Sequence, residues 1–162
     1  MAPDPDPAGP GDALGRLAAA LGGAPKGPAP VERWNPAYCG EIPMRIDRDG
    51  TWFYMGTPIG RPALVKLFAS VLRRDPERFV LVTPVERVGI EVEDAPFAAV
   101  EMAAAGEGPG RTIAFRTNVD DLVEVGPDHP LRFEEEPESG GVKPYVLVRG
   151  GLWARLTRAL TF

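Results

Sequence analysis

Few side chains in this sequence could serve as nucleophiles, and their spacing limits the reactions that they could support. The serines are Ser70 and Ser139, and the other reactive side chains are Cys39 and His129. A serine hydrolase needs a serine exposed at a sharp turn beside a histidine and a carboxylate. Ser70 falls inside a predicted helix, so we interpret it as a packing residue. We interpret Cys39 as a small buried thiol and His129 as a loop histidine, rather than as a catalytic dyad.

Metal ligands are equally sparse. One cysteine and one histidine would need two carboxylates to complete a structural zinc site, which is an uncommon set. The sequence also has a group of glutamates that could suggest a hard cation: Glu134, Glu135, Glu136 and Glu138. Successive strand residues point to opposite faces, so we interpret this group as a solvated hairpin tip. We predict no metal and no cofactor.

Carboxylates tuned by burial can act as acid or base without histidine or cysteine. For such an enzyme we would assign this role to Glu86, Glu93 or Asp94, with Arg45 or Arg132 as an anion clamp. A deep pocket that holds a buried carboxylate of raised pKa beside an arginine would favour this alternative. A shallow exposed groove would favour a binding module without catalytic residues.

The composition argues against several other classes of protein. The net charge of −5 disfavours a general nucleic-acid binder, whose domain is usually basic. No run of about 18 apolar residues occurs, so we expect no membrane span. Acidic Asp4 and Asp6 near the N-terminus do not fit a signal peptide. Because a single cysteine cannot form an internal disulfide, we predict a cytoplasmic protein.

Residues 1–30 differ from the rest of the chain, since 21 of these 30 positions are Pro, Gly or Ala. Such a segment has little apolar surface to offset the entropy lost on ordering, so we expect it to be mobile. Asp12 can cap a short helix at about 12–21 within it, which Gly22 and Gly23 would end.

Regular structure is predicted from Val31 onward. The sequence Asp47-Arg48-Asp49-Gly50 separates two short β-compatible runs and predicts a hairpin, because glycine readily adopts a positive φ. Pro62 is favoured in a first helical turn, and apolar residues at helical spacing follow it up to Val71. We predict a helix at about 62–74, with Arg73 and Arg74 at its C-terminus, where cations are favourable.

The second half of the sequence is typical of β-structure. Its expected strands and hairpins are 79–82, 87–93, 97–104 with 111–117, 131–135 with 145–149, and 152–157, and residues 119–125 form a short helix or an irregular strand. We therefore predict an α+β fold of two small lobes, at 31–83 and 84–162. Arg48-Asp49-Gly50-Thr51-Trp52 and Arg149-Gly150-Gly151-Leu152-Trp153 share Arg, Gly and Trp in register, which suggests a duplicated β-hairpin/helix motif.

Several blocks of the sequence also resemble one bacterial family. They include Trp34–Ile46, Asp49–Tyr54, Gly56–Arg61, Leu81–Glu86, Val92–Phe97, Thr117–Val119 and His129–Arg132. In these blocks the chain resembles DUF1285, a family of proteins of unknown function, over roughly residues 31–157. The resemblance implies a two-lobed fold with a repeated motif and a second lobe superficially like pleckstrin-homology domains. It also implies a ligand or partner groove and a link to bacterial signalling.

Similar proteins continue beyond the position of Phe162 with further strand-like sequence, so we expect a shortened second lobe. Such a lobe would leave an unpaired C-terminal edge strand, and an unpaired edge invites pairing with another chain. We therefore predict self-association or reduced stability.

Taken together, these observations favour a non-enzymatic regulatory module that binds an unknown small molecule or protein. We expect neither nucleic acid nor membrane as a partner. The candidate contacts are polar residues within or beside the blocks that resemble the family: Arg45, Tyr54, Thr83, Glu86, Asn118 and Arg132.

Overall fold

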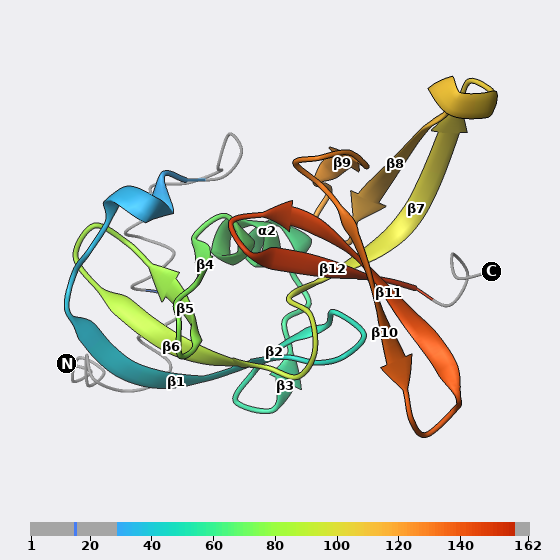
Figure 1. The fold of residues 1–162 in the computed structure, drawn as a ribbon. Coiled ribbons are helices and arrows are strands. Elements are labelled where there is room, and N and C mark those ends of the chain that lie inside the picture. The colour runs from blue at the N-terminus through green and yellow to red at the C-terminus, as the bar shows by residue number, and fades with distance from the viewer. Residues whose placement is uncertain (1–14, 16–28, 158–162) are drawn as a thin grey trace, which may run out of the picture. The chain divides into compact units, whose positions relative to one another are not determined.

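The computed structural model describes Gly15 and residues 29–157 of the chain (Figure 1). The helix predicted at 12–21, apart from Gly15, and most of the segment predicted to be mobile therefore lie outside the described residues.

The chain divides into two compact units. The first comprises Met1–Asp47 and Thr51–Val92, and the second comprises Arg48–Gly50 and Glu93–Phe162. The sequence pattern placed the boundary between residues 83 and 84, whereas the structure places it after Val92. The difference arises because the strand at Arg87–Val92 pairs with two strands of the first unit.

The first unit contains one six-stranded mixed sheet. Its elements in chain order are η1 (Val31–Arg33), β1 (Tyr38–Ile46), β2 (Trp52–Tyr54), β3 (Thr57–Pro58), α2 (Pro62–Ala69), β4 (Leu72–Arg74), β5 (Phe79–Val82) and β6 (Arg87–Val92). The strand order is β3-β2-β1-β6-β5-β4, in which β1 and β6 are parallel and the other neighbours are antiparallel. The hairpin predicted around Asp49-Gly50 is confirmed, since β1 pairs with β2.

Helix α2 begins at Pro62 as predicted but ends at Ala69, so the predicted extension to Arg74 is wrong. The Ser70 hydroxyl donates to the Leu67 carbonyl oxygen at 2.6 Å, and the chain then leaves the helix. Leu72 pairs with Leu81 across β4 and β5. Val71 lies between the helix and β4 and is buried. Its apolar side chain therefore fits the helical spacing although it lies beyond the helix, and the spacing alone did not reveal where the helix ends.

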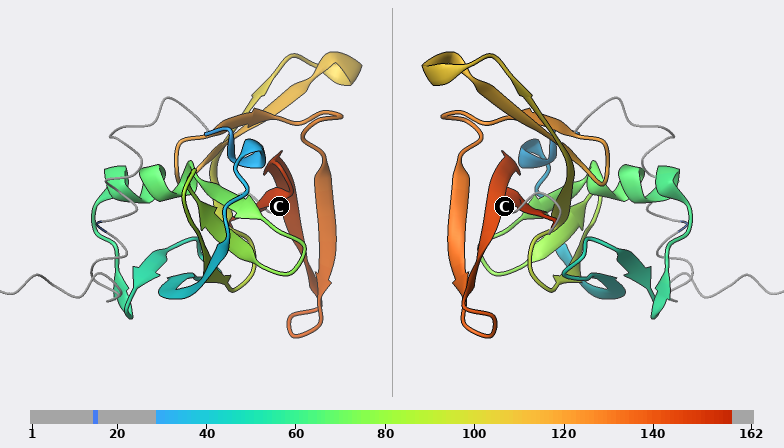
Figure 2. Two further views of the ribbon diagram at one scale, coloured as in Figure 1. Left: turned by 90° about the vertical axis from the view of Figure 1, so that its left-hand side faces the viewer. Right: turned by 90° about the vertical axis from the view of Figure 1, so that its right-hand side faces the viewer.

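The second unit contains another six-stranded mixed sheet, and no helix longer than one turn occurs in its described part. Its elements are β7 (Phe97–Ala105), η2 (Gly108–Gly110), β8 (Thr112–Thr117), β9 (Leu122–Glu124), β10 (Leu131–Glu136), β11 (Gly141–Arg149) and β12 (Leu152–Leu156). The predicted hairpins β7–β8, β10–β11 and β11–β12 are confirmed. The region 119–125 holds the short strand β9. Figure 2 shows the β7–β8 hairpin extending beyond the rest of its sheet.

The two units share one topology. The second sheet has the order β10-β11-β12-β7-β8-β9, in which β12 and β7 are parallel. Each unit therefore joins two antiparallel three-stranded meanders through a parallel pairing of its first and sixth strands. The predicted duplication is present in the strands. The helix of the predicted motif is not repeated within the described part of the second unit, where residues 125–130 connect β9 to β10.

The sequence echo near Arg48 and Arg149 does not mark equivalent positions of this repeat. Arg48 lies between β1 and β2, the first two strands of one unit, whereas Arg149 ends β11, the fifth strand of the other. Both segments are glycine turns of antiparallel hairpins, which explains their likeness.

The strand nearest the C-terminus is not an edge strand, contrary to the prediction. β12 lies between β11 and β7, and the Thr157 amide donates to the Ala99 carbonyl oxygen at 3.1 Å. Among the described strands, the edges of this sheet are β10 and β9. No helix in the described part of the chain is long and apolar enough to cross a membrane.

Candidate functional site: a charged pocket in the second unit

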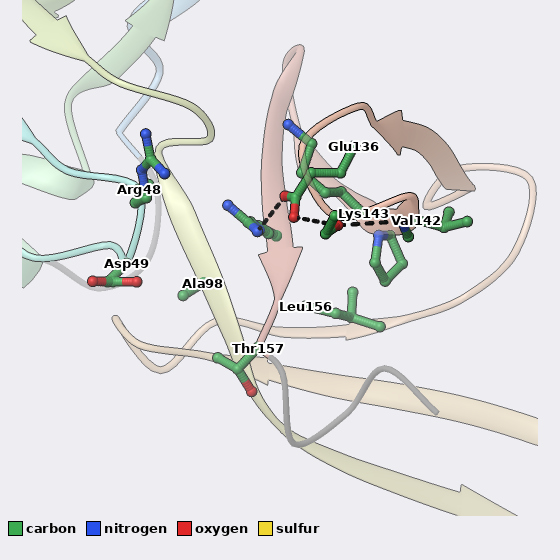
Figure 3. Close-up of a pocket in the computed structure, with 12 residues that line it drawn as sticks. Arg48, Asp49, Ala98, Glu136, Val142, Lys143, Leu156 and Thr157 are labelled. Carbon is green, nitrogen blue, oxygen red and sulfur yellow. Dashed lines mark hydrogen bonds and ion pairs between the residues drawn. The ribbon is translucent and has the colours of Figure 1, made fainter.

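A pocket of about 520 Å³ opens on the second unit (Figure 3). Its wall combines the Arg48–Asp49 turn, the start of β7, the end of β12 and the β10–β11 hairpin. The charged residues that line it are Arg48, Asp49, Glu136, Lys143 and Arg155. Figure 3 shows Arg48 and Asp49 on one side of the pocket and Glu136 and Lys143 on the other.

Asn118 holds the turn that carries Arg48 and Asp49. Its amide nitrogen donates to the Gly50 carbonyl oxygen at 2.9 Å, and its amide oxygen accepts from the Ala98 backbone N–H at 3.0 Å. Gly50 has φ +85°, and a Cβ at this position would lie 2.9 Å from the Asn118 amide nitrogen. Only glycine therefore fits here without strain, and both ends of the Asn118 amide are used in positioning.

Arg155 lies in the pocket wall between two carboxylates. Its guanidinium is 3.3 Å from Asp94 and 3.4 Å from Glu136. Tyr145 donates its hydroxyl to both Asp94 oxygens at 2.9 Å. Burial and the neighbouring Asp94 carboxylate raise the pKa of Tyr145, so the hydroxyl stays protonated at neutral pH. This network neutralises Arg155 and fixes its orientation.

Arg48 and Lys143 differ from Arg155 because neither has a carboxylate partner among the described residues. Arg48 is exposed and Lys143 is half-buried. An unpaired guanidinium and an unpaired ammonium at one pocket can both bind a carboxylate or a phosphate. These two side chains give the pocket its capacity for an anionic ligand.

The predicted contacts Asn118 and Arg132 lie in the second unit, but neither lines the pocket. Asn118 is a positioning residue. The Arg132 guanidinium stacks between two aromatic rings, 4.7 Å from the Tyr145 centroid and 4.4 Å from that of Trp153. It also lies 3.8 Å from Glu134.

The other predicted contacts lie in the first unit. The Arg45 guanidinium lies 4.3 Å from the centre of the Phe53 ring. Thr83 is fully buried, and its hydroxyl oxygen accepts from the Val85 and Glu86 amides, so it shapes the β5–β6 turn. Tyr54 is half-buried on β2. The predicted contacts are thus divided between the two units, and the structure does not bring them together within either one as a single site.

The predicted basic group at the helix end has a different role. Arg73 binds Asp75 at 2.7 Å and donates to the carbonyl oxygens of Val31 and Trp34, which fastens η1 to the sheet. Burial opposes ionisation of Asp75, but hydrogen bonds from Arg73 and Arg87 outweigh it and lower the pKa of this carboxyl.

The interpretation of Cys39 as a buried thiol is wrong, since its side chain is exposed. The ring of His129 donates from Nδ1 to the Leu147 carbonyl oxygen at 2.9 Å, which gives it a role in the loop. Among Gly15 and residues 29–157, no group of His, Cys, Asp and Glu could hold a metal ion.

Sequence reasoning missed Arg48, Lys143 and Arg155 as site residues. Arg48 belongs to a hairpin turn, and Lys143 and Arg155 belong to the neighbouring strands β11 and β12, along which side chains alternate between the two faces. No local pattern distinguishes these residues from solvated charges, because their convergence depends on strands distant in the chain.

Comparisons with known proteins agree with the two-unit structure. The models of the N-terminal and C-terminal domains of the DUF1285 family, described as domains of unknown function, match residues 29–95 and 96–162. The crystal structure of a DUF1285 family protein from Silicibacter pomeroyi DSS-3 is similar, with a TM-score of 0.83 and 53% identity over 88% of this chain and 78% of that chain. A DUF1285 family protein from Shewanella baltica OS155 is also similar, with a TM-score of 0.56 and 30% identity over 72% of this chain and 85% of that chain. No curated protein matches.

Proposed function

We propose that this chain, which belongs to the DUF1285 family, is a non-enzymatic binding module whose second unit holds a small anionic molecule. One observation carries the proposal: Arg48 and Lys143 line the pocket, and neither has a carboxylate partner in the described part of the chain. Arg149 of the same unit, by contrast, is neutralised by Asp121 at 2.7 Å.

The dimensions and charge of the pocket support a small polar ligand. A volume of about 520 Å³ falls within the range of roughly 300–1,000 Å³ that is typical of small-molecule sites. Asp49 and Glu136 line the same pocket, so a ligand that carries hydrogen-bond donors as well as a carboxylate or phosphate group fits best. A metabolite of this kind matches the lining better than a long polyanion does.

The alternative enzyme with a carboxylate acid or base gains no support from the same region. Asp94 accepts hydrogen bonds from Tyr145 and Arg155, which occupy both of its oxygens. Glu93 is exposed, and Glu86 belongs to the β5–β6 turn of the first unit.

Three further expectations from the sequence are part of this proposal. They are a likeness of the second unit to pleckstrin-homology domains, a role in bacterial signalling and a cytoplasmic location. The likeness and the signalling role are what the resemblance to the family implies, and the single cysteine is the ground for the location.

Thermal denaturation tests the proposal, because a ligand that binds only the folded state raises the melting temperature. The full chain is heated with inorganic phosphate, nucleotides, phosphorylated sugars and di- and tricarboxylates. We expect one of these anionic groups to raise the midpoint, and Arg48→Gln and Lys143→Gln each to reduce the rise by about half or more.

Arg111→Gln is the matched control. It removes the same charge from an exposed arginine of the second unit that is not part of the pocket. An equal reduction in all three variants would mean that net charge, not the pocket, attracts the ligand. A rise that neither pocket variant changes would refute the assignment to this site.

A further inference from the structure

Strand β10 is an exposed edge of the second sheet. Within the described residues it has β11 on one side and no strand on the other. Its six residues, Leu131–Glu136, include no proline, and its register with β11 is unbroken from Leu131↔Val146 to Glu136↔Gly141. It therefore lacks the prolines and bulges that usually protect an edge from pairing with another chain.

The direction of the β10 peptide groups follows from one hydrogen bond. The Leu147 amide donates to the Pro130 carbonyl oxygen at 3.0 Å, so the peptide groups of Pro130 face β11. Because these groups alternate along an antiparallel strand, Arg132 and Glu134 also face β11. The N–H and C=O groups of Leu131, Phe133 and Glu135 consequently point away from β11, toward the side on which no described strand lies.

Two large apolar side chains are exposed at this hairpin. Phe133 is 62% exposed, and Val142 on the neighbouring strand is 57% exposed. Val142 lies opposite Glu135, two positions along β10 from Phe133, so both apolar side chains are on the same face of the hairpin. The charged groups of Arg132 and Glu134 are on the other face and are 42% and 45% exposed.

We propose that two copies of the chain join through their β10 strands, which pair antiparallel and symmetrically about Phe133. This register places Phe133 opposite Phe133 of the second copy and Leu131 opposite Glu135, and the outward peptide groups of these residues exchange hydrogen bonds. It also places Arg132 opposite Glu134 twice, once on each side of the symmetry axis. These are the closely spaced positions of the ladder, so the opposite charges lie side by side.

Complementarity selects both this register and this partner. Centring the pairing on Glu134 would oppose Glu134 to Glu134 and Phe133 to Glu135, which is unfavourable. Centring it on Phe133 pairs Arg132 with Glu134 on both sides of the axis, as an isologous interface requires, and leaves Glu135 opposite Leu131. The other edge of the sheet, β9, has only the three residues Leu122–Glu124 and offers no comparable length.

Exchange of the charges tests the pairing. Arg132→Glu opposes Glu to Glu134 in a homodimer, and Glu134→Arg opposes Arg132 to Arg, so each variant alone should be monomeric. A mixture of the two restores opposite charges at both positions and should recover the dimer. Sedimentation equilibrium of the wild-type chain, each variant and the equimolar mixture measures this, with Arg111→Glu as a control that leaves the dimer intact.

Cysteine cross-linking tests the register without altering the charges. In a Cys39→Ser background, Phe133→Cys lies on the symmetry axis and should form a disulfide-linked dimer under mild oxidation. Leu131→Cys should not link to itself, because this register places it opposite residue 135. It should link when it is mixed with Glu135→Cys.

Each outcome decides the proposal. A wild-type chain that stays monomeric at all accessible concentrations overturns it. So does a dimer that survives both charge variants, or one in which Leu131→Cys links to itself as readily as Phe133→Cys does.

Discussion

The two units share one strand order but use their arginines in different ways. In the first unit, Arg73 and Arg87 both bind Asp75 at 2.7 Å, and Arg73 also holds the carbonyl oxygens of Val31 and Trp34. In the second unit, Arg155 is neutralised in the pocket wall, whereas Arg48 and Lys143 are left without carboxylates among the described residues. The Arg73–Asp75–Arg87 cluster of the first unit joins parts of the fold, whereas Arg48 and Lys143 line a pocket without a carboxylate partner among the described residues.

The contrast shows that two units with the same strand order can differ in their connections and in the roles of their charged side chains. Each unit pairs its first strand with its sixth at the centre of its sheet, but the connection between the third and fourth strands differs between the units. In the first unit, helix α2 lies in the connection between β3 and β4, and its residues Leu67 and Phe68 are buried. The second unit has a short connection there, and its β10–β11 hairpin instead provides a pocket wall and an exposed edge.

The largest effect should come from the turn that supplies Arg48. Gly50→Ala combines a positive φ with a Cβ placed 2.9 Å from the Asn118 amide nitrogen, so it should reduce the free energy of unfolding by about 3 kcal/mol. Gly56→Ala is the matched control, since Gly56 has φ +82° but no atom within 4 Å of the added Cβ, and it should cost about 1 kcal/mol. Urea denaturation measures both, and equal losses would mean that the Asn118 contact does not constrain the turn.

A smaller effect is expected at the charge cluster of the first unit. Asp75→Ala leaves Arg73 and Arg87 without their carboxylate and should cost about 2 kcal/mol at pH 7. Because the folded-state pKa of Asp75 lies below 3.8, its contribution is complete above that pH and is lost as pH falls through the folded value. The difference between wild type and variant should therefore shrink in acid.

Glu77→Ala provides the comparison for that experiment. Glu77 is 81% exposed and contacts Arg78 at 3.4 Å, so its removal should have little effect at any pH. A pH-independent loss for Asp75→Ala would show that packing, not charge, makes this cluster stabilising.

The smallest effect concerns the network behind the pocket. Tyr145→Phe removes the hydroxyl that donates to Asp94 and should cost about 1 kcal/mol near neutral pH. The folded-state pKa of Tyr145 is raised above its ordinary value of 10.0, so the hydroxyl stabilises the fold below that pH and the contribution is lost as pH rises through the folded value. Calorimetry from neutral to alkaline pH should show the two proteins converging, and a constant gap would contradict this assignment.

Local signals in the sequence were sufficient for the hairpins. Asp49-Gly50 and Gly150-Gly151 have positive φ at their glycines and connect antiparallel strands, as turn chemistry predicts. The end of helix α2 was not predictable in this way, because Val71 and Leu72 are buried whether they continue a helix or enter a strand. The boundary after Val92 escaped prediction since it depends on the pairing of β6 with β1.

The sequence by itself therefore determined the turns, the strands beside them and the family to which the chain belongs. Only the tertiary structure decided which strands pair at the centre of each sheet and which cations lack a carboxylate among the described residues. The parallel contacts β1–β6 and β12–β7 join segments tens of residues apart, and no local pattern encodes them. The same folding brings Arg48, Lys143 and Arg155 to one pocket. Within residues 29–157 it gives carboxylate partners to Arg155 alone of these three, because Asp94 and Glu136 converge there from separate elements.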